Sequence, residues 1–139
     1  MMYVLKGGTI VSVGDKELLS NQDVMIQGGK IVRIAGSIEA KGAKVLDCTG
    51  KYLLPGLFDM HIHIAIEDVL PVFLLAGVTS VRNMWGSPKH LDLAQKIERG
   101  EIIGPHVFTA SPLYDFQDKE NDGRRLMLSK EDAKAAVDD

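Results

Sequence analysis

Two histidines, His61 and His63, stand two residues apart in an apolar stretch and are the side chains best suited to hold a metal ion. On a β-strand, residues i and i+2 share a face and lie about 6.5–7 Å apart along the chain. Imidazoles at that spacing can lean onto one cation, with bonds of about 2.0–2.1 Å each for zinc. A strand over residues 57–64 would also place Asp59 on the histidine face. Its other face would be apolar and would pack under helices, through Phe58, Met60, Ile62 and Ile64.

The composition of the chain limits the classes of protein in which the two histidines can occur. The chain has 139 residues, of which 45% are hydrophobic and 25% charged, as in a globular protein with one or two small domains. A net charge of −3 provides no basic surface for nucleic acid. The longest apolar run, residues 69–78, is about half of what a bilayer span requires, and no apolar leader opens the chain. We therefore expect no nucleic-acid partner, no membrane insertion and a cytoplasmic location.

The single cysteine, Cys48, excludes an internal disulfide and a multi-cysteine zinc site. Cys48 is expected to be a small buried apolar side chain.

Short strands with glycine-rich turns are predicted over the first 55 residues. Gly28-Gly29 separates two alternating segments, and two glycines that can both adopt positive φ are typical of a tight hairpin. Gly7-Gly8 and residues 14–16 are predicted as further turns. We predict a small antiparallel β unit over residues 1–55, with strands at 3–5, 9–13, 23–27, 30–34, 45–48 and 52–54.

From residue 57 the pattern alternates between strand and helix, which is typical of parallel strands joined by helical crossovers. Strands are predicted over 57–64, 78–83 and 106–110, and helices over 68–76, over 88–99 and from about residue 130. Ser87-Pro88 and Gly100 mark the start and end of the second helix, and Ser129 with Asp132 resembles a capping box. Residues 111–128, including Asn121-Asp122-Gly123, are predicted to form a polar loop.

Three parallel strands leave an open edge on each side of a sheet, and a parallel sheet is normally covered on both faces. We therefore expect the chain to be one piece of a larger assembly, which self-associates as a homo-oligomer or pairs with another chain.

The segment around the histidines resembles the metal-binding strand of the amidohydrolase superfamily, whose pattern is P-G-x-x-D-x-H-x-H, and residues 54–63 match it. Residues 27–31 are similar to the N-terminal hairpin of these enzymes, residues 77–84 to their second strand, and residues 104–111 to their third. The most similar branch is that of the imidazolonepropionase and prolidase-like enzymes. The resemblance covers nearly the whole chain but only about the first third of a usual family member.

The resemblance implies an α/β fold: a partial (β/α)8 TIM barrel of about three β/α units over residues 56–139, preceded by a small antiparallel β-sandwich domain over residues 1–55. It also implies a hydrolase that cleaves C–N bonds of cyclic amides, dipeptides or N-acyl amino acids through a metal-activated water. His61 and His63 would ligate a divalent metal, zinc being the expected ion, in a protein that holds one or two ions. The other family ligands and the catalytic base come from later strands, so no catalytic residue is expected within this chain.

A bare His-x-His pair would more often be two structural histidines, and it is the surrounding pattern that favours ligands. Asp59 is interpreted as a second-shell or strand-anchoring group. Arg82 is a substrate-contact candidate, with a salt bridge as an equal alternative. Asn83 stands where this branch often has aspartate.

Other polar residues are expected to have no catalytic role. His90 is expected to be solvated on a polar helix face and His106 to be structural. Arg124 and Arg125 are expected in a solvated loop, with contact to a substrate carboxylate as the alternative. A solvated acidic face is predicted for Asp115, Asp118, Glu120 and Asp122.

Three functional hypotheses remain at this point. The first is the N-terminal part of a metal-dependent amidohydrolase acting on a small-molecule substrate, inactive alone because two histidines are too few ligands for a catalytic zinc. The second is a non-catalytic module that binds the rest of a barrel or another copy of itself. The third is urease- or dihydroorotase-like chemistry within the same superfamily, which the early chain does not separate from the first.

Overall fold

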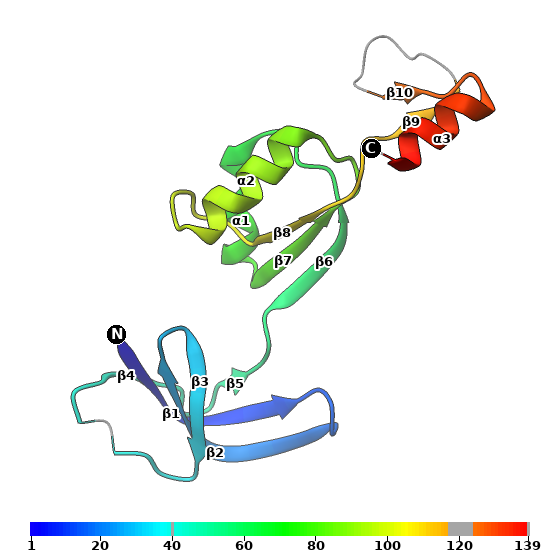
Figure 1. Ribbon diagram of the computed structural model, residues 1–139. Helices are drawn as coiled ribbons and strands as arrows, with labels where there is room; N and C mark the ends of the chain where they lie inside the picture. Colours follow the sequence, from blue (N-terminus) through cyan, green and yellow to red (C-terminus); the bar gives the residue numbers. More distant parts are fainter. Residues whose placement is uncertain (40, 117–123, 139) are drawn as a thin grey trace. The chain divides into compact units, whose positions relative to one another are not determined.

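The computed structural model describes residues 1–39, 41–116 and 124–138, and the chain divides into two units, Met1–Pro55 and Gly56–Asp139. Both units contain β-sheet, and the helices belong to the second, so the fold is mixed α/β (Figure 1). The predicted loop residues Asn121-Asp122-Gly123, and the acidic residues Asp118, Glu120 and Asp122, lie outside the described part of the chain.

The first unit is a five-stranded sheet built around one long strand. The strands are β1 Met2–Ser12, β2 Glu17–Gln27, β3 Lys30–Ala35, β4 Lys44–Asp47 and β5 Tyr52–Leu53. Strand β2 pairs antiparallel with β1 on one side and with β3 on the other, whereas β4 and β5 pair parallel with β1. The predicted hairpin between β2 and β3 is confirmed, with φ of 59° at Gly28 and 77° at Gly29. The expectation of a purely antiparallel unit is wrong for β4 and β5, because the chain crosses over after β3 and then runs along one edge of β1, in the direction of β1, through β4 and β5.

The predicted turn at Gly7-Gly8 is wrong as well. Both glycines lie inside the continuous strand β1, where the pairing with β2 shifts register. Gly7 has a φ of 67°, which glycine adopts at little cost, and its N–H donates to the Asp23 carboxylate at 2.9 Å. The two glycines therefore form a bulge in one strand rather than a turn between two.

Asp23 organises the polar centre of the first unit. Its carboxylate is buried, at 4% exposure, and accepts hydrogen bonds from the Lys6 ammonium at 2.7 Å and the Ile38 N–H at 2.8 Å, besides that of Gly7. Lys6 also donates to the Ile38 carbonyl at 2.7 Å. The hydrogen bond from Lys6 lowers the pKa of the Asp23 carboxyl; burial opposes the shift, and the N–H groups of Gly7 and Ile38 add to it. This network ties β1, β2 and the segment after β3 together.

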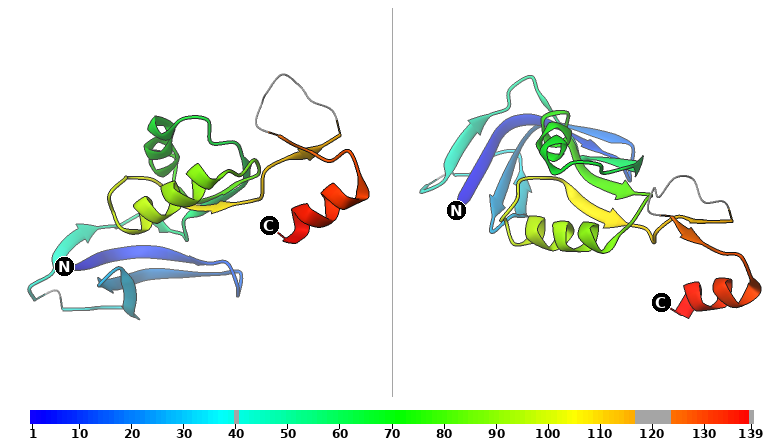
Figure 2. Two further views of the ribbon diagram at one scale, coloured as in Figure 1. Left: turned by 45° about the horizontal axis from the view of Figure 1, so that its top comes forward. Right: turned by 90° about the horizontal axis from the view of Figure 1, so that it is seen from above.

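The second unit begins with three strands, β6 Leu57–Ile62, β7 Val78–Asn83 and β8 His106–Thr109. They form a parallel sheet of strand order β6-β7-β8, as the alternating pattern predicts. The first helical segment is a 3-10 turn, Glu67–Val69, that continues as α1 Leu70–Leu75, with Pro71 in its first turn. Helix α2 is Pro88–Glu98, and Figure 2 shows it running alongside β8.

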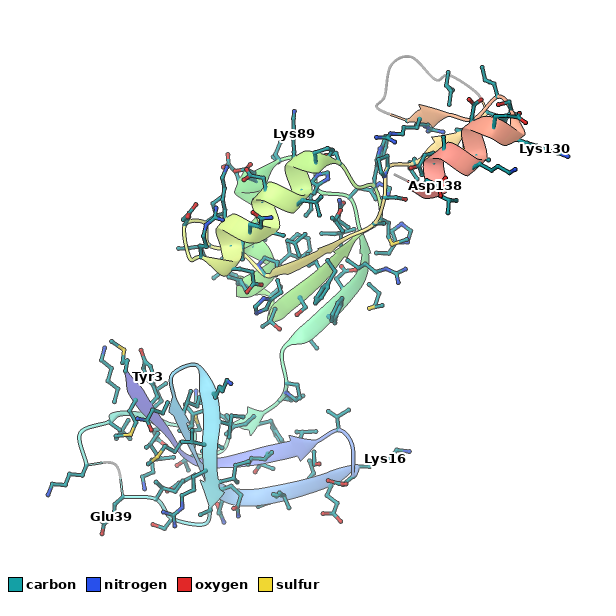
Figure 3. The ribbon with its side chains drawn as sticks, viewed as in Figure 1. Tyr3, Lys16, Glu39, Lys89, Lys130 and Asp138 are labelled. Carbon is teal, nitrogen blue, oxygen red and sulfur yellow. The ribbon has the colours of Figure 1, made fainter. Side chains whose placement is uncertain are left out.

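One hydrophobic cluster joins the helices to a single face of this sheet. Ile64 after β6, Leu70 of α1 and Leu93 of α2 are buried together. Ile62, Ile97, Ile102 and Val107 pack against them. Figure 3 shows the side chain of Lys89, near the start of α2, pointing away from the strands, as expected for the solvent side of a covering helix.

The segment beyond β8 holds a pair of two-residue parallel strands, β9 Tyr114–Asp115 and β10 Arg125–Leu126, which the prediction of a plain loop missed. The last helix, α3 Lys130–Asp138, begins as predicted. The Asp132 N–H donates to Ser129 Oγ at 3.0 Å, and the Asp132 carboxylate accepts the Leu128 N–H at 2.9 Å. Within the described residues, every helix is too short or too polar to cross a bilayer.

Replacing Asp23 should change how the first unit responds to acid. Because its folded pKa is lowered, the Asp23 carboxylate contributes stability that is present above its unfolded pKa of about 3.9 and is lost as the pH falls below that value. The free energy of unfolding of Asp23→Asn, measured by urea titration at several pH values, should therefore fall less steeply in acid than that of the parent chain.

Lys6→Met should flatten the acid response in the same way, because Lys6 is the main cause of the shift. Lys16→Met, at the tip of the β1–β2 hairpin (Figure 3), should follow the parent chain. Equal acid slopes in all four proteins would contradict the role given to Asp23.

Candidate metal centre

The two histidines lie at the carboxyl end of β6, with His61 in the strand and His63 just beyond it. Their ring centroids are 5.4 Å apart and the ring planes are tilted by 40°. Two imidazoles bound to one zinc at tetrahedral angles, with bonds of about 2.0–2.1 Å, have ring centres about 5 Å apart. The separation of the two rings therefore matches that of two ligands of one metal ion.

A register shift between Asp59 and Ile62 changes the predicted faces of β6. Asp59 is in register with Val81, and Ile62 with Asn83, both of which are buried. Since paired residues of neighbouring strands share a face, Asp59 and Ile62 lie on the helix-covered side although three positions separate them. The expectation that Asp59 shares the histidine face is wrong, because an extra residue bulges from the strand between them.

As a result of the bulge, the apolar residues of this segment do not all lie on the side of the sheet that the helices cover. Ile62 and Ile64 pack in the core under the helices, as predicted, but Phe58 does not. It stacks on Phe108 of β8 at a centroid distance of 5.5 Å, and the two side chains are 46% and 55% exposed. Met60 is exposed as well.

Asp59 acts on the backbone of the bulge. Its Oδ1 accepts the N–H of His61 at 3.1 Å, which satisfies a donor that the shifted ladder leaves open. The carboxylate therefore holds the chain at the first histidine of the pair. This contact matches the strand-anchoring alternative for Asp59.

Asn83 connects the carboxyl ends of all three parallel strands. It is completely buried, and its Oδ1 accepts the N–H of Ile64 at 3.0 Å. Its Nδ2 donates to the Trp85 carbonyl at 2.8 Å and to Thr109 Oγ1 at 3.1 Å. An amide supplies both the acceptor and the donors, whereas an aspartate carboxylate would supply acceptors only.

His90 is a half-buried group rather than the solvated residue that its helix pattern suggests. Its Nε2 lies 3.0 Å from the carbonyl oxygen of Ile64, and its Nδ1 lies 3.2 Å from the Ser87 hydroxyl. The helical period places His90 near the start of α2, but it does not show that this end of the helix faces the chain after β6.

A pocket of about 370 Å³ opens beside His63. His63 and Trp85 meet edge to face there, with ring centroids 5.8 Å apart. The pocket is lined by His63, Ile64, Ala65, Trp85, Gly86, Ser87 and His90. The carboxyl ends of parallel strands meet at one edge of a sheet. Residues 84–87 directly follow β7, so the sequence could have predicted that they lie beside the histidines at this edge.

Gly86 allows the chain to pass close to β8 at this edge. A Cβ at this position would lie 1.6 Å from the carbonyl oxygen of Ala110, and the Gly86 N–H donates to the Ser111 carbonyl at 3.0 Å. Only glycine fits such a close backbone approach.

Arg124 extends the neighbourhood of Trp85 to the segment after β8. Its guanidinium carbon lies 5.9 Å from the centroid of the indole ring, a cation–π distance, and its Nη1 pairs with the Asp115 carboxylate at 2.5 Å. Asp115 is therefore half-buried in an ion pair, and its predicted place on a solvated acidic face is wrong. Arg125 lies in β10.

The remaining sequence candidates lie on β7, at the start of β8 and in the first unit. Arg82 is exposed on β7, in register with Phe108, and its Nε donates to the Met84 sulfur at 2.9 Å. His106, at the opposite end of the parallel sheet, is exposed, and its Nδ1 lies 2.5 Å from the Glu98 carboxylate. Cys48 is buried, as predicted.

Within residues 1–39, 41–116 and 124–138, no group of three or more His, Cys, Asp or Glu side chains is arranged to hold a metal ion. His61 and His63 thus have no third candidate ligand beside them in this part of the chain. A catalytic zinc generally has three protein ligands and a water, so the pair fits part of such a site.

Comparison with curated proteins finds dihydroorotases. The chain is 44% identical over 63 residues to the dihydroorotase of Listeria monocytogenes serotype 4a, a match that covers 45% of this chain and 14% of that protein. It is 45% identical over 65 residues to the dihydroorotase of Pelotomaculum thermopropionicum, covering 46% of this chain and 15% of that protein. The matched segments thus span about a seventh of the length of these relatives. No protein-family model matches the chain.

Solved structures match almost the entire chain. A prolidase complexed with N-methylphosphonate-L-proline superposes with a TM-score of 0.85 at 23% identity, over 99% of this chain and 43% of that one. A Xaa-Pro dipeptidase with bound methionine gives a TM-score of 0.80 at 21% identity, over 99% and 44%. A candidate prolidase from Bifidobacterium longum gives 0.78 at 27% identity, over 99% and 37%.

Asn83→Ala should destabilise the second unit by about 1–3 kcal/mol, because it removes the partners of the Ile64 N–H and the Trp85 carbonyl at a buried position. Urea unfolding followed by tryptophan fluorescence measures the change, since Trp85 is the only tryptophan of the chain. Gln95→Ala, on the exposed side of α2, is the control and should lie within about 0.5 kcal/mol of the parent. A loss for Asn83→Ala no larger than that of the control would contradict the role given to Asn83.

Proposed function

The chain matches the N-terminal portion of amidohydrolase-superfamily proteins, and on that premise we propose that it forms the first part of a metal-dependent hydrolase of C–N bonds. The substrates would be cyclic amides, dipeptides or N-acyl amino acids. The main observation in support is the pair of imidazoles at the carboxyl end of β6, whose ring centroids are 5.4 Å apart. Relatives named dihydroorotases and structural neighbours named prolidases support C–N bond hydrolysis and leave the choice between cyclic amides and dipeptides open.

The parallel sheet supports a place for this unit in a (β/α)8 barrel. Strands β6, β7 and β8 would be its first three strands, with α1 and α2 on the outer face. Active sites of such barrels lie at the carboxyl ends of the strands, which is where His61, His63 and the neighbouring pocket are found. The first unit would be the N-terminal part of a β-sandwich domain completed by other strands.

Each described residue near the pair has a specific task in this proposal. His61 and His63 would hold a divalent cation, with zinc the expected ion, and Asp59 fixes the backbone of the first histidine. When bound, the cation supplies a water of lowered pKa and polarises the amide carbonyl. Arg82 is the substrate-contact candidate, on the exposed side of β7. The general base and the remaining ligands would come from strands that follow these three.

A second candidate, a non-catalytic module that binds a second copy or the rest of a barrel, is favoured by the apolar side of the parallel sheet that the helices do not cover. Phe58 and Phe108 stack there while about half of each side chain stays exposed. A parallel sheet is normally covered on both faces, so this side is suited to a partner surface. A homo-oligomer is the form that we propose for the chain on its own.

Zinc or cobalt titrated into the purified chain should bind weakly at the histidine pair, without turnover of dipeptides, N-acyl amino acids or cyclic amides. His61→Gln and His63→Gln should each abolish the calorimetric signal, because a single imidazole leaves one ligand. His106→Gln removes a distant histidine and should bind like the parent. Metal-dependent turnover by the chain alone would overturn its predicted inactivity, and unchanged binding in both pair variants would overturn the site.

Self-association is tested by size-exclusion chromatography with light scattering. A mass above the 15.2 kDa of the monomer is expected, and Phe108→Lys should reduce it, because a charge on the uncovered face opposes its burial. Leu75→Lys places the same charge on an exposed position of α1 and should leave the mass unchanged. A monomer that does not expose apolar surface to a hydrophobic dye would contradict the module candidate.

A further inference from the structure

We propose that His90 is a positioning residue for His63: it holds the backbone of Ile64, the residue that directly follows the second histidine of the pair. The inference rests on the proposed metal site and adds a task for a third histidine beside it. His63 and His90 both line the same pocket, and they have different roles in this proposal.

Both backbone polar groups of Ile64 are bound by side chains from other elements. The N–H donates to Asn83 Oδ1 of β7 at 3.0 Å, and the carbonyl oxygen lies 3.0 Å from His90 Nε2 of α2. Ile64 itself is buried, at 8% exposure, in the core between the helices and the sheet. Strand β6 ends at Ile62, so these two contacts replace the ladder that no longer holds the chain at this point.

The Ile64 carbonyl determines which nitrogen of the His90 ring must carry a hydrogen. The Ile64 carbonyl can only accept, so Nε2 carries the hydrogen and donates it. In the neutral ring Nδ1 is then an acceptor, and the Ser87 hydroxyl 3.2 Å away donates to it. Ser87 is the N-cap residue of α2, but its side chain makes no capping hydrogen bond, so its hydroxyl serves the His90 ring instead.

These bonds exclude His90 from acting as a third metal ligand in this arrangement. A ligating nitrogen needs a free lone pair directed at the ion, whereas Nε2–H is directed at a carbonyl and the Nδ1 lone pair faces a hydroxyl. The two hydrogen bonds of Ile64 also restrict the orientation of His63. With the next residue fixed at both its N–H and its carbonyl, the Cα–Cβ bond of His63 has one direction, and the edge-to-face contact with Trp85 limits the ring.

The experiment compares four variants of the whole chain with the parent. His90→Phe keeps a flat ring and removes both hydrogen bonds, His90→Gln keeps an N–H that can reach the Ile64 carbonyl, and Ser87→Ala removes the partner of Nδ1. His106→Gln is the matched control, because it removes one histidine at the other end of the sheet.

Two readouts are taken for each variant. The first needs no metal: the chemical shifts of the His63 ring protons, which the nearby Trp85 ring displaces, and the hydrogen exchange of the Ile64 amide. The second is cobalt binding followed by its visible absorption. His90→Phe should reduce the Trp85-induced shift of His63 and weaken cobalt binding about tenfold or more, as loss of an outer-shell partner does. His90→Gln should restore both readouts toward the parent values, Ser87→Ala should lie between, and His106→Gln should match the parent.

The outcomes distinguish this proposal from the metal site on which it rests. If the His63 shifts respond to His90→Phe but the parent binds no cobalt, the positioning role stands and the metal proposal fails. If His63 shifts and cobalt affinity are unchanged in His90→Phe, the positioning role is overturned. If His90→Phe and His90→Gln both lose cobalt while the His63 shifts stay constant, His90 is a ligand and the proposal is also overturned. Should His90→Phe not fold, the same comparisons are made with Ser87→Ala and His90→Gln.

Discussion

The second unit depends on one buried side-chain amide, that of Asn83, whose donors and acceptor all find hydrogen-bond partners. Asn83 is the last residue of β7, and its side chain binds the chain after β6, the chain after its own strand, and Thr109 at the end of β8. Parallel strands have no tight turns to fix their carboxyl ends, so side chains must hold the segments that leave the sheet. A buried polar network stabilises a single arrangement only when each member finds its partner, and the donors and acceptor of Asn83 all do. The pocket beside His63 is formed by the segments that this amide holds.

The two faces of the parallel sheet differ in how they are covered. On one face, Leu70 and Leu93 from two helices meet Ile62 and Val107 from the strands, which produces a small continuous core. On the other, the stacked pair Phe58 and Phe108 remains half exposed. The same asymmetry explains why the histidines are accessible. His61 and His63 are exposed at the edge of a sheet whose core lies on the side of the helices.

The sequence predicted those helices and strands whose ends are set by residues within the same segment. Gly28-Gly29 forms the expected turn with positive φ at both residues, and β7 covers the predicted residues because β-branched side chains fill it between two glycine- or proline-marked segments. Features that depend on partners far along the chain were missed. The bulge at Gly7 is held by a carboxylate sixteen residues away, and the role of His90 depends on a carbonyl twenty-six residues away. Periodicity within one segment contains no information on such contacts.

The bulge in β6 shows why the candidate site also differs from its sequence prediction in one detail that matters chemically. Strict alternation would place the Asp59 carboxylate beside both imidazoles, where it could compete for the same cation. The register shift instead places Asp59 opposite the buried Val81, and its oxygen binds the His61 N–H. The strand thereby exposes two imidazoles and uses its one carboxylate to hold the backbone at His61. In the proposed metal centre, further ligands would come from neighbouring strands, because a single strand of this geometry has two side chains to offer at its end. Such a divided centre would form only when the strands are assembled, and this would link the chemistry of the histidine pair to the completion of the sheet.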